Sequence, residues 1–382
     1  MSPTKPLASP ARIAVIPGDG IGVEVTAEAV KVLRAAAAAC GGEIKFQEFD
    51  WGANRFLRDG VTLPDGAVEM LRRAFDAILF GALGDPRVPF PNYAPAILLG
   101  LRFKLDLYAN VRPVALLDRR LTPLRDREEK DVNFTVIREN TEGLYVAVGG
   151  QFKRGTPDEV AVQEDVNTRK GVERILRYAF DYAARLVPTR RDRAPRLCMS
   201  DKSNVLTFGH ELWQRVFAEV KKDYPGIEAR HLLVDTLAME MVRDPSQFDV
   251  IVTCNMFGDI LSDLAAQLAG GLGLAPSGNI NPESVSLFEP VHGSAPNIAG
   301  TNTANPAGAV LSAAMMLDHL ASPVGAGLPR QPFSRAAALI NAAVRAAIQQ
   351  GKTTRDLGGS LGTREMGDFL ADFVTLQAGA RP

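Results

Sequence analysis

The sequence predicts an α/β protein with a largely parallel central sheet, and three observations support this class. Short β-rich runs alternate with segments of helical apolar periodicity along most of the 382 residues. A composition with 46% hydrophobic and 23% charged residues is typical of a globular protein and argues against wholesale disorder. At roughly 150 residues per domain, the length predicts two or three domains, or one large intertwined unit.

The first elements follow one another closely. A strand is predicted at 12–16, and after a glycine-rich turn a helix runs from residue 23 to the Gly-Gly pair at 41–42. The next predicted elements are a strand, a helix and a strand, at 44–49, 64–75 and 77–80.

The middle of the chain carries more β-rich runs, at 133–137, 196–199, 231–234 and 250–253. Helical patterns accompany them at 168–186, 209–223, 236–243 and 257–269. From residue 307 onward the periodicity predicts helices only, at 307–320, 335–349 and 364–376.

The charge, cysteine and histidine counts exclude several classes of function. Lys and Arg number 43 against 44 Asp and Glu, which gives no electrostatic reason to bind nucleic acid or an anionic membrane. The three cysteines lie far apart, form no disulfide framework or CxxC pair, and favour a reducing compartment. With only four histidines, acids, bases and metal ligands are expected to be Asp, Glu, Lys or Tyr.

No segment has the pattern of a targeting sequence or a membrane span. The first ten residues carry three prolines and no apolar run, which predicts a loose tail. The most apolar stretch, 307–317, is about half the length that a bilayer requires. We therefore expect a soluble, cytoplasmic protein.

The glycine cluster Gly18-Asp-Gly-Ile-Gly22 lies between a predicted strand and a predicted helix. It is similar to a dinucleotide-binding fingerprint, but its spacing is G-x-G-x-G and not G-x-G-x-x-G. A plain tight turn is the alternative, since glycine tolerates the backbone conformations that such turns need.

Three arginines lie in otherwise apolar surroundings, where an unpaired guanidinium is costly: Arg102, Arg112 and Arg138. Each could donate two parallel hydrogen bonds to a substrate carboxylate, which favours a small dicarboxylate ligand. The alternative is internal pairing with Asp106, Glu139 or Glu142.

Three aspartates form a candidate metal site. Asp235 ends the predicted strand that begins at 231, whereas Asp259 and Asp263 are four residues apart and share one helix face. A cation between them would relieve their repulsion, and an all-oxygen set selects Mg²⁺ or Mn²⁺. Helix capping by Asp259 is an equally good explanation.

Two further segments carry chemistry. Lys202 follows the strand at 196–199, and it could act as a base if its pKa were lowered from about 10.4, although a surface lysine is the simpler interpretation. The Gly-, Ser-, Pro- and Asn-rich segment 288–300, followed by Asn305, predicts a long ordered loop. Its backbone donors, together with His292, could hold an adenosine or a phosphate.

Taken together, these segments resemble the β-decarboxylating dehydrogenase family, which acts on isopropylmalate, isocitrate, homoisocitrate, tartrate or D-malate. The similarity spans nearly the whole chain, and its most specific motifs are Asn-Met-Phe-Gly-Asp-Ile-Leu-Ser-Asp at 255–263 and Glu-Pro-Val-His-Gly-Ser-Ala-Pro at 289–296. The resemblance implies a two-domain α/β fold that is not a Rossmann fold. The expected domains are a discontinuous cofactor domain, 1–108 with 270–382, and a substrate, metal and dimerisation domain, 109–269.

The resemblance also implies roles for individual residues in a homodimer with shared active sites. Arg102, Arg112 and Arg138 would bind the malate portion of the substrate, and Asp235, Asp259 and Asp263 would hold Mg²⁺ or Mn²⁺. Lys202 would move the hydroxyl proton and Tyr145 would protonate the product, with Lys202 and Asp235 supplied by the other subunit. The residues expected at the adenosine half of the cofactor are Glu289, His292, Gly293, Ser294, Ala295, Pro296, Asn297 and Asn305.

Two local segments indicate which cofactor and which substrate the protein prefers. Asn297 replaces a common Asp and cannot repel a 2′-phosphate, which weakens discrimination against NADP. NAD remains favoured, because Ile298 follows it where NADP-using isocitrate enzymes of the family carry Lys-Tyr. Leu98 and Leu99 form an apolar wall ahead of Arg102, which favours 3-isopropylmalate over isocitrate or homoisocitrate. The run 138–150 is closer to the tartrate and D-malate branch. A non-catalytic regulatory subunit is the alternative from another class, but the chain keeps the lysine, the tyrosine and the three aspartates.

Overall fold

The computed structural model describes residues 10–88, 93–186, 193–322 and 330–379, so most of the expected N-terminal tail lies outside the described residues. By its internal contacts the chain divides into two units. Unit 1 contains Met1–Leu107, Leu117–Pro123 and Ala269–Pro382, and unit 2 contains Tyr108–Leu116 and Leu124–Leu268.

The strands of unit 1 run in the order β2-β1-β3-β12-β11. Their bounds are β1 Ala11–Gly18, β2 Ile44–Glu48, β3 Ala77–Ala82, β11 Pro276–Ile280 and β12 Ser286–Pro290. Strands β2, β1, β3 and β12 pair in parallel, whereas β11 is antiparallel to β12. The predicted α/β class is confirmed, and these strands are largely parallel as expected, with β11 as the antiparallel exception.

Strands β3 and β12 and the centre of β1 are buried on both faces, because apolar residues occupy alternate and intervening positions alike. In β1, Ala14 and Ile16 join one core cluster together with Ile78 and Phe80 of β3. The intervening residue Ile13 is also fully buried. Parallel strands covered by helices on both faces show this continuous apolar pattern.

On the first face, three helices cover the strands: α2 (Ala53–Asp59), α3 (Ala67–Ala74) and α4 (Ala94–Lys104). Leu71 of α3 and Ile97 and Leu101 of α4 are fully buried in the cluster that contains Ile16 and Phe80. Helix α4 is therefore fixed to the sheet by its own apolar side chains.

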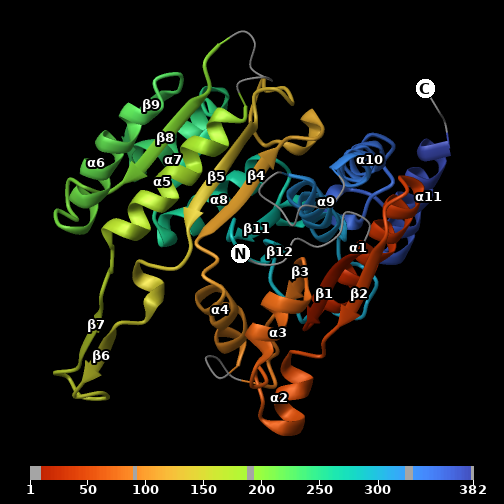
Figure 1. Ribbon diagram of the computed structural model, residues 1–382, viewed down its shortest axis with the longest axis horizontal. Coiled ribbons are helices and arrows are strands. Elements are labelled where there is room, and N and C mark those ends of the chain that lie inside the picture. The colour runs from red at the N-terminus through yellow and green to blue at the C-terminus, as the bar shows by residue number, and fades with distance from the viewer. Residues whose placement is uncertain (1–9, 89–92, 187–192, 323–329, 380–382) are drawn as a thin grey trace. The chain divides into compact units, whose positions relative to one another are not determined.

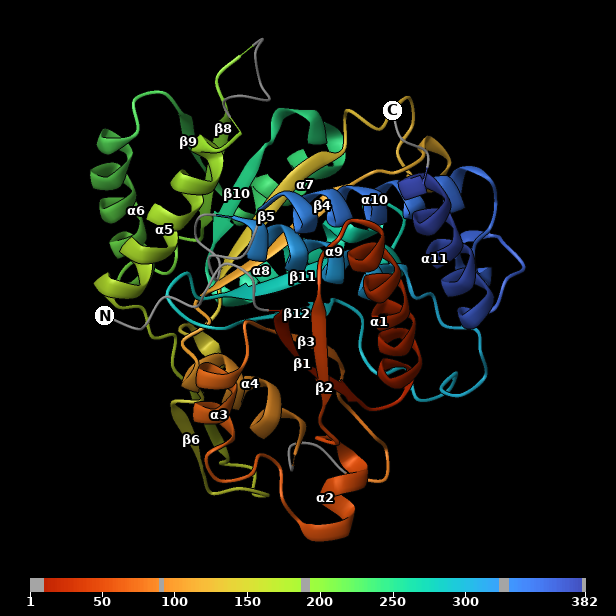
Figure 2. The ribbon, with the colours of Figure 1, turned by 45° about the vertical axis from the view of Figure 1, so that its right-hand side comes forward.

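The second face is covered by α1 (Ile21–Ala39), α9 (Ala307–Ala321), α10 (Arg330–Gln349) and α11 (Thr363–Gly379). These four helices pack against one another, and α9 also contacts β3, β11 and β12. Figures 1 and 2 show red α1 beside the blue C-terminal helices, so segments from the two ends of the chain form one layer. The prediction that the chain is helical from residue 307 is confirmed for the described residues.

The strands of unit 2 run in the order β4-β5-β10-β8-β9. They are β4 Ala109–Ala115, β5 Asn133–Glu139, β8 Arg196–Asp201, β9 Glu228–Leu233 and β10 Val250–Thr253. Strands β5, β10, β8 and β9 are parallel, and β4 is antiparallel to β5. The carboxyl ends of four strands therefore meet at one edge, where polar segments follow them.

Helices α5 (Arg169–Ala184) and α6 (Gly209–Val220) pack together, as do α7 (Val234–Arg243) and α8 (Asn255–Leu268). Figure 1 shows α5 and α6 in front of the unit 2 strands and α7 and α8 behind them. A separate hairpin of β6 (Gly149–Phe152) and β7 (Val160–Gln163) extends from this unit, and all of its strand residues are exposed.

Some elements differ from the sequence prediction for identifiable reasons. Strand β4 was not expected because Pro113 and Arg112 interrupt its apolar pattern. Strand β11 was missed because it consists largely of Pro, Ser, Gly and Asn, which have low strand propensity. Helix α2 is short and buries only Ala53, so it lacks a clear periodic signal.

Two predicted boundaries are also corrected. The loop predicted at 288–300 begins as strand, since β12 extends to Pro290. The segment 117–123 was expected in the second domain, but it belongs to unit 1, where Arg120 Nη2 donates to the carbonyl of Ile348 at 3.2 Å. Among the described residues, no helix combines the length and the apolar character that crossing a membrane requires.

Replacing the buried Leu71 tests the first core. Leu71→Ala should lower the free energy of unfolding by about 3 kcal/mol, because it removes buried methyl groups and leaves a cavity. Urea denaturation measures the change, and Arg73→Ala on the same helix, at an exposed side chain, is the control. A loss below about 1 kcal/mol for Leu71→Ala would show that this cluster does not support the unit.

Candidate functional site

Strand register brings two of the predicted arginines onto one face of unit 2. In the antiparallel pair β4–β5, Asn110 lies opposite Arg138. Because side chains alternate along a strand, Arg112 points to the same face as Asn110. Arg112 and Arg138 are both buried, and Arg138 is only 1% exposed.

Each guanidinium is held by polar groups that the sequence analysis did not single out. Arg112 Nε donates to Asn110 Oδ1 at 2.7 Å, and its Nη1 donates to Ser262 Oγ at 2.7 Å. Arg138 Nε donates to Asn255 Oδ1 at 2.9 Å. The position of Asn110, two residues before Arg112 on a strand, is a signal that could have identified it.

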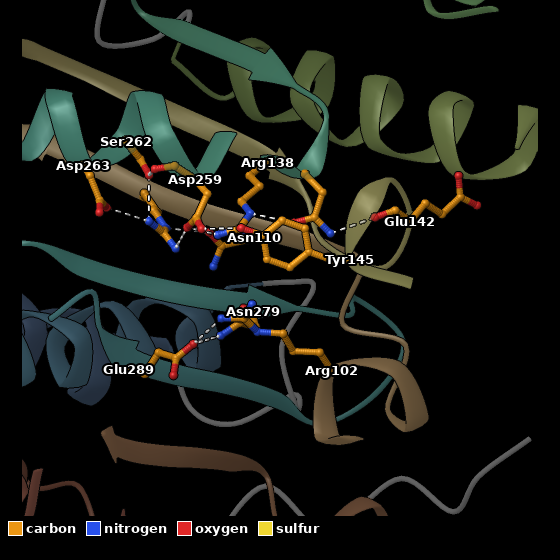
Figure 3. Close-up of polar contacts among 12 residues, drawn as sticks. Arg102, Asn110, Arg138, Glu142, Tyr145, Asp259, Ser262, Asp263, Asn279 and Glu289 are labelled. Atoms are coloured by element: carbon orange, nitrogen blue, oxygen red, sulfur yellow. Dashed lines mark hydrogen bonds and ion pairs between the residues drawn. The ribbon is translucent and has the colours of Figure 1, made fainter. Parts of the chain in front are cut away.

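Both arginines form ion pairs with aspartates of α8, and Figure 3 shows Arg138 beside Asp259. Arg112 reaches Asp259 Oδ1 at 3.1 Å and Asp263 Oδ1 at 3.3 Å, and Arg138 Nη1 also pairs with Asp259. Internal pairing was one predicted alternative, with Asp106, Glu139 or Glu142, and the ion pairs described here are instead with Asp259 and Asp263.

Tyr145 completes this group. It lies in the 3₁₀ turn Leu144–Val146, its hydroxyl donates to Asp259 Oδ2 at 2.7 Å, and the Arg138 guanidinium lies 5.0 Å from its ring centroid. The cluster of Arg112, Arg138, Tyr145, Asp259 and Asp263 therefore gathers five of the predicted site residues, and we call it the arginine–aspartate cluster.

Close packing of α8 on β5 requires the glycine of the Asn-x-Phe-Gly-Asp motif. A Cβ atom at Gly258 would lie 2.5 Å from Arg138 Cβ, which is closer than real side chains approach. Gly258 thus lets the helix lie against the strand so that Asp259 can reach Arg138. Asp259 lies in the second turn of α8, which begins at Asn255, so the predicted capping role is not the one it has.

The electrostatics of the cluster penalise the negative charge on Asp263. Burial of part of the Asp263 side chain raises its pKa, and the negative charge of Asp259 adds to this effect although Arg112 opposes it. A divalent cation beside both carboxylates would offset that penalty. The oxygen-only donor set fits Mg²⁺ or Mn²⁺.

Lys202 and Asp235 form a second pair in unit 2. Lys202 Nζ lies 2.8 Å from Asp235 Oδ1, and this lysine, through its hydrogen bond, lowers the pKa of Asp235. Asp235 was expected to end a strand. It belongs instead to the first turn of α7.

No group of three His, Cys, Asp or Glu side chains in the described part of this chain is arranged to hold a metal ion. Asp259 and Asp263 meet at Arg112, but Asp235 does not join them in one such group. A third carboxylate would therefore have to come from outside these residues of one chain.

Arg102 belongs to unit 1, where it is buried on α4 and forms an ion pair with Glu289 of β12 at 3.0 Å. Asn279 Nδ2 donates to the same Glu289 oxygen at 2.8 Å, and Figure 3 shows this group. Arg102 Nε is buried and has no hydrogen-bond partner among the described residues. Glu289 was predicted to bind the cofactor, but its contacts are with Arg102 and Asn279.

The loop after β12 contacts the glycine cluster. Ile21 N donates to Ser294 O at 2.8 Å, and a Cβ at Gly20, whose φ is 57°, would lie 2.0 Å from that oxygen. Asp19 ties the same turn to its surroundings by accepting hydrogen bonds from Ala53 N and from the Tyr93 hydroxyl, at 2.7 and 2.6 Å. The glycines therefore serve a tight turn, in agreement with the alternative to a dinucleotide fingerprint.

The predicted cofactor residues of this loop differ in whether their polar atoms already have hydrogen-bond partners. His292 Nδ1 lies 2.9 Å from the Gly293 carbonyl, whereas its Nε2 is buried and has no partner among the described residues. Burial lowers the pKa of His292, so its imidazole is neutral at neutral pH and Nε2 can accept a hydrogen bond. This unpartnered acceptor fits an adenine amino group.

Other residues of the loop are exposed or already engaged. Gly293, Pro296 and Asn297 are exposed, and Ser294 is buried. Asn305 uses both ends of its amide, since it donates to Asp356 Oδ2 and accepts from the Ala307 amide, each at 2.9 Å. Asn305 therefore binds the first amide of α9, and its side chain is not free for a ligand without a rearrangement.

The predicted substrate wall lies on α4. Ile97 and Leu101 are fully buried, whereas Leu98 and Leu99 are half-buried and Ala96 is exposed. Leu98 also packs against the first core cluster. These two leucines are thus the large apolar side chains of this segment that keep exposed surface.

Comparison with known proteins agrees with this arrangement. Residues 12–370 match the protein family described as "Isocitrate/isopropylmalate dehydrogenase". The chain is 46% identical to a protein named "3-isopropylmalate dehydrogenase" from Thermobifida fusca, over 96% of this chain and 98% of that protein.

Solved structures show the same fold. An isocitrate dehydrogenase from Methylococcus capsulatus matches with a TM-score of 0.82 and 38% identity, over 96% of this chain and 99% of that chain. A β-decarboxylating dehydrogenase from Thermococcus kodakarensis matches with a TM-score of 0.75 and 37% identity, over 97% and 98%. Because family match and fold both extend over nearly the whole chain, the protein belongs to the isocitrate/isopropylmalate dehydrogenase family.

Proposed function

We propose that this protein catalyses the oxidative decarboxylation of 3-isopropylmalate, with NAD as the hydride acceptor and Mg²⁺ or Mn²⁺ as the metal. The observation that carries the proposal is the arginine–aspartate cluster, found in a chain that is 46% identical to a 3-isopropylmalate dehydrogenase along its length. The cluster supplies cations for a dicarboxylate and carboxylates for a metal in one place.

Charge balance supports binding of substrate and metal together. Arg112 and Arg138 contribute two positive charges, and Asp259 and Asp263 contribute two negative charges, so the cluster is neutral. A divalent cation and a dicarboxylate dianion added together keep it neutral, whereas either one alone leaves two uncompensated charges in a partly buried site. The arginines would exchange their aspartate partners for the substrate carboxylates.

The reaction divides between two proton-transfer residues. When bound, the metal would polarise the C2 hydroxyl of the substrate, and the nicotinamide would accept the hydride from C2. Lys202 takes the hydroxyl proton, and its contact with Asp235 orients the amine. Tyr145 then supplies a proton to C3 after CO₂ has left, from a hydroxyl that the Asp259 carboxylate orients.

The cofactor would lie along the loop that follows β12. His292 offers its unpartnered Nε2, and the exposed Asn297 can bond a ribose hydroxyl without repelling a 2′-phosphate. This weakens discrimination against NADP, and NAD stays the preferred cofactor because the next residue is Ile298 and not a cation that would bind the 2′-phosphate. Gly293, Ala295 and Pro296 would contribute backbone contacts, while Glu289 acts by holding Arg102.

We propose a homodimer in which Lys202 and Asp235 serve the site of the other subunit. On α7, Asp235 shares a helix face with Met239 and Val242, which are 64% and 45% exposed, and Ile260 of the neighbouring α8 is 61% exposed. A second copy that covers this apolar surface would also cover Asp235, and could supply the third carboxylate. The exposed hairpin, with Phe152 at 65%, also favours a partner, because two-stranded hairpins are marginally stable alone.

A second candidate function is the decarboxylating oxidation of D-malate or tartrate. The segment from Arg138 to Gly150, which holds Tyr145, favours this branch. The half-buried Leu98 and Leu99 favour the isopropyl substituent, since burying an apolar group against them is worth about 1–3 kcal/mol.

A substrate panel decides between these candidates. The purified protein, with Mn²⁺ and either NAD or NADP, should reduce NAD fastest with 3-isopropylmalate when D-malate, tartrate, isocitrate and homoisocitrate are offered separately. The value of kcat/KM should exceed that for D-malate by about tenfold or more, and Leu98→Ser should reduce this ratio. A preference for tartrate or D-malate would overturn the substrate assignment, and inactivity with all five acids would favour a regulatory subunit.

Substitution of the two proton-transfer residues tests their roles. Lys202→Met and Tyr145→Phe should each lower kcat by roughly 10²-fold or more, because general acid–base catalysis contributes at least this much. Steady-state NADH formation measures the loss. Lys222→Met and Tyr224→Phe, at positions outside the cluster, should keep the turnover of the unmodified protein. Unchanged turnover in Lys202→Met or Tyr145→Phe would remove the assigned role.

Metal removal tests the charge balance. EDTA should abolish activity, and Mg²⁺ or Mn²⁺ should restore it. Binding of Mn²⁺, followed by electron paramagnetic resonance, should tighten about tenfold or more when 3-isopropylmalate is present, because each ligand offsets the charge of the other. Asp259→Asn should weaken Mn²⁺ binding, and Asp50→Asn, at an exposed carboxylate paired with Arg58, should not. Mn²⁺ affinity that does not depend on the substrate would contradict the proposed charge coupling.

A further inference from the structure

A buried histidine contacts the main chain of Lys202. His210 lies in the first turn of α6, is 1% exposed, and its Nδ1 accepts the amide N–H of Lys202 at 2.7 Å. Because a backbone amide can only donate, Nδ1 must be unprotonated and the imidazole proton must be on Nε2. His210 therefore acts here as a neutral acceptor with a fixed tautomer.

The surroundings of His210 keep the ring neutral. Its Nε2 has no hydrogen-bond partner among the described residues, and the Asp165 carboxylate is 3.7 Å away. The Phe257 ring lies nearly perpendicular to the imidazole, with 5.6 Å between the two ring centroids. Burial lowers the pKa of His210, although the charges of Asp201 and Asp165 oppose this effect. At neutral pH, Nδ1 thus keeps the lone pair that the amide needs.

The rest of the Lys202 backbone is also fixed. The Lys202 carbonyl accepts the amides of Val205 and Leu206, at 3.0 and 2.8 Å. The preceding side chain, Asp201, is fully buried and bonds Ser203 N, Gln214 Nε2 and His231 Nε2. His210 supplies the contact to the one remaining polar group, the N–H of Lys202 itself.

This arrangement matters because the lysine side chain starts from that backbone. A shift at the Lys202 Cα carries through to Nζ, which lies 2.8 Å from Asp235. Loss of the Nδ1 acceptor would also leave a partly buried N–H unsatisfied, and the local turn would move to find another partner.

We propose that His210 is a positioning residue for Lys202, whose imidazole Nδ1 sets the lysine backbone and thereby the place from which the amine takes the substrate proton. The inference rests on the proposed function in assigning that proton transfer to Lys202. His210 itself touches no reacting atom in this account.

Two polar substitutions separate positioning from packing. Asn places an amide oxygen near the position of Nδ1, whereas Gln places its amide near Nε2. His210→Asn should keep kcat within about threefold of the unmodified protein, while His210→Gln and His210→Leu should lower it about tenfold with little change in the KM for 3-isopropylmalate. Val216→Ala, a fully buried position on the same helix, is the control for loss of packing.

The outcomes distinguish the two explanations. The inference is supported if His210→Asn keeps kcat, His210→Gln lowers it, and Val216→Ala leaves it unchanged. Equal turnover in Asn and Gln variants, or a loss of kcat in Val216→Ala that matches the loss in His210→Leu, would overturn it. If His210→Leu does not fold, the comparison of Asn with Gln still decides.

A second measurement does not depend on activity. The rate at which Lys202 reacts with acetic anhydride, followed by peptide mass spectrometry and normalised to Lys222, reports the surroundings of the amine. His210→Gln should change this rate by about threefold or more, and His210→Asn should restore it. A rate that is the same in all variants would overturn the inference. If the unmodified protein oxidises none of the five acids, the proposed function fails, but the labelling result still tests the contact between His210 and Lys202.

Discussion

The ion pairs of Arg138 and Arg112 with Asp259 are the interaction on which the site of unit 2 depends. A guanidinium that is 1% exposed would be prohibitively costly without a counter-charge, so β5 and α8 must lie close enough for Arg138 to reach the aspartate. Gly258 permits that approach, and Asn255 and Asn110 occupy guanidinium donors that face neither aspartate. The same charges that stabilise the ligand-free protein are those that the substrate and the metal would use.

Each unit contributes a different kind of support. In unit 1, the apolar core fixes α4, which carries Arg102, against the sheet. Strand β12 of that sheet carries Glu289, the partner of Arg102. In unit 2, polar side chains gather where the parallel strands end, and hydrogen bonds to Asp201 and His210 order the segment around Lys202. Rigid strands thus place residues that are far apart in the sequence, and short polar contacts set their final orientation.

Much of this could be predicted from the sequence, and the limits have physical causes. The helices from residue 307 and strand 250–253 were correctly predicted because their apolar patterns are strong. Strand β4 was not predicted, because Pro113 interrupts its apolar pattern. Without β4, the register that places Asn110 opposite Arg138 could not be predicted either. The partners of Arg102, Arg112 and Arg138 could not be predicted, since ion pairs between residues 147 or 187 positions apart depend on the tertiary fold.

Helix α4 has a consequence for how the substrate range of such a protein can change. Ile97 and Leu101 belong to the core, so their replacement destabilises unit 1, whereas Leu98 and Leu99 keep exposed surface between them. Under the proposed function, a change in the accepted side group would be confined to the exposed positions of one helix. One or two exchanges there would leave the arginines, the aspartates and the core as they are.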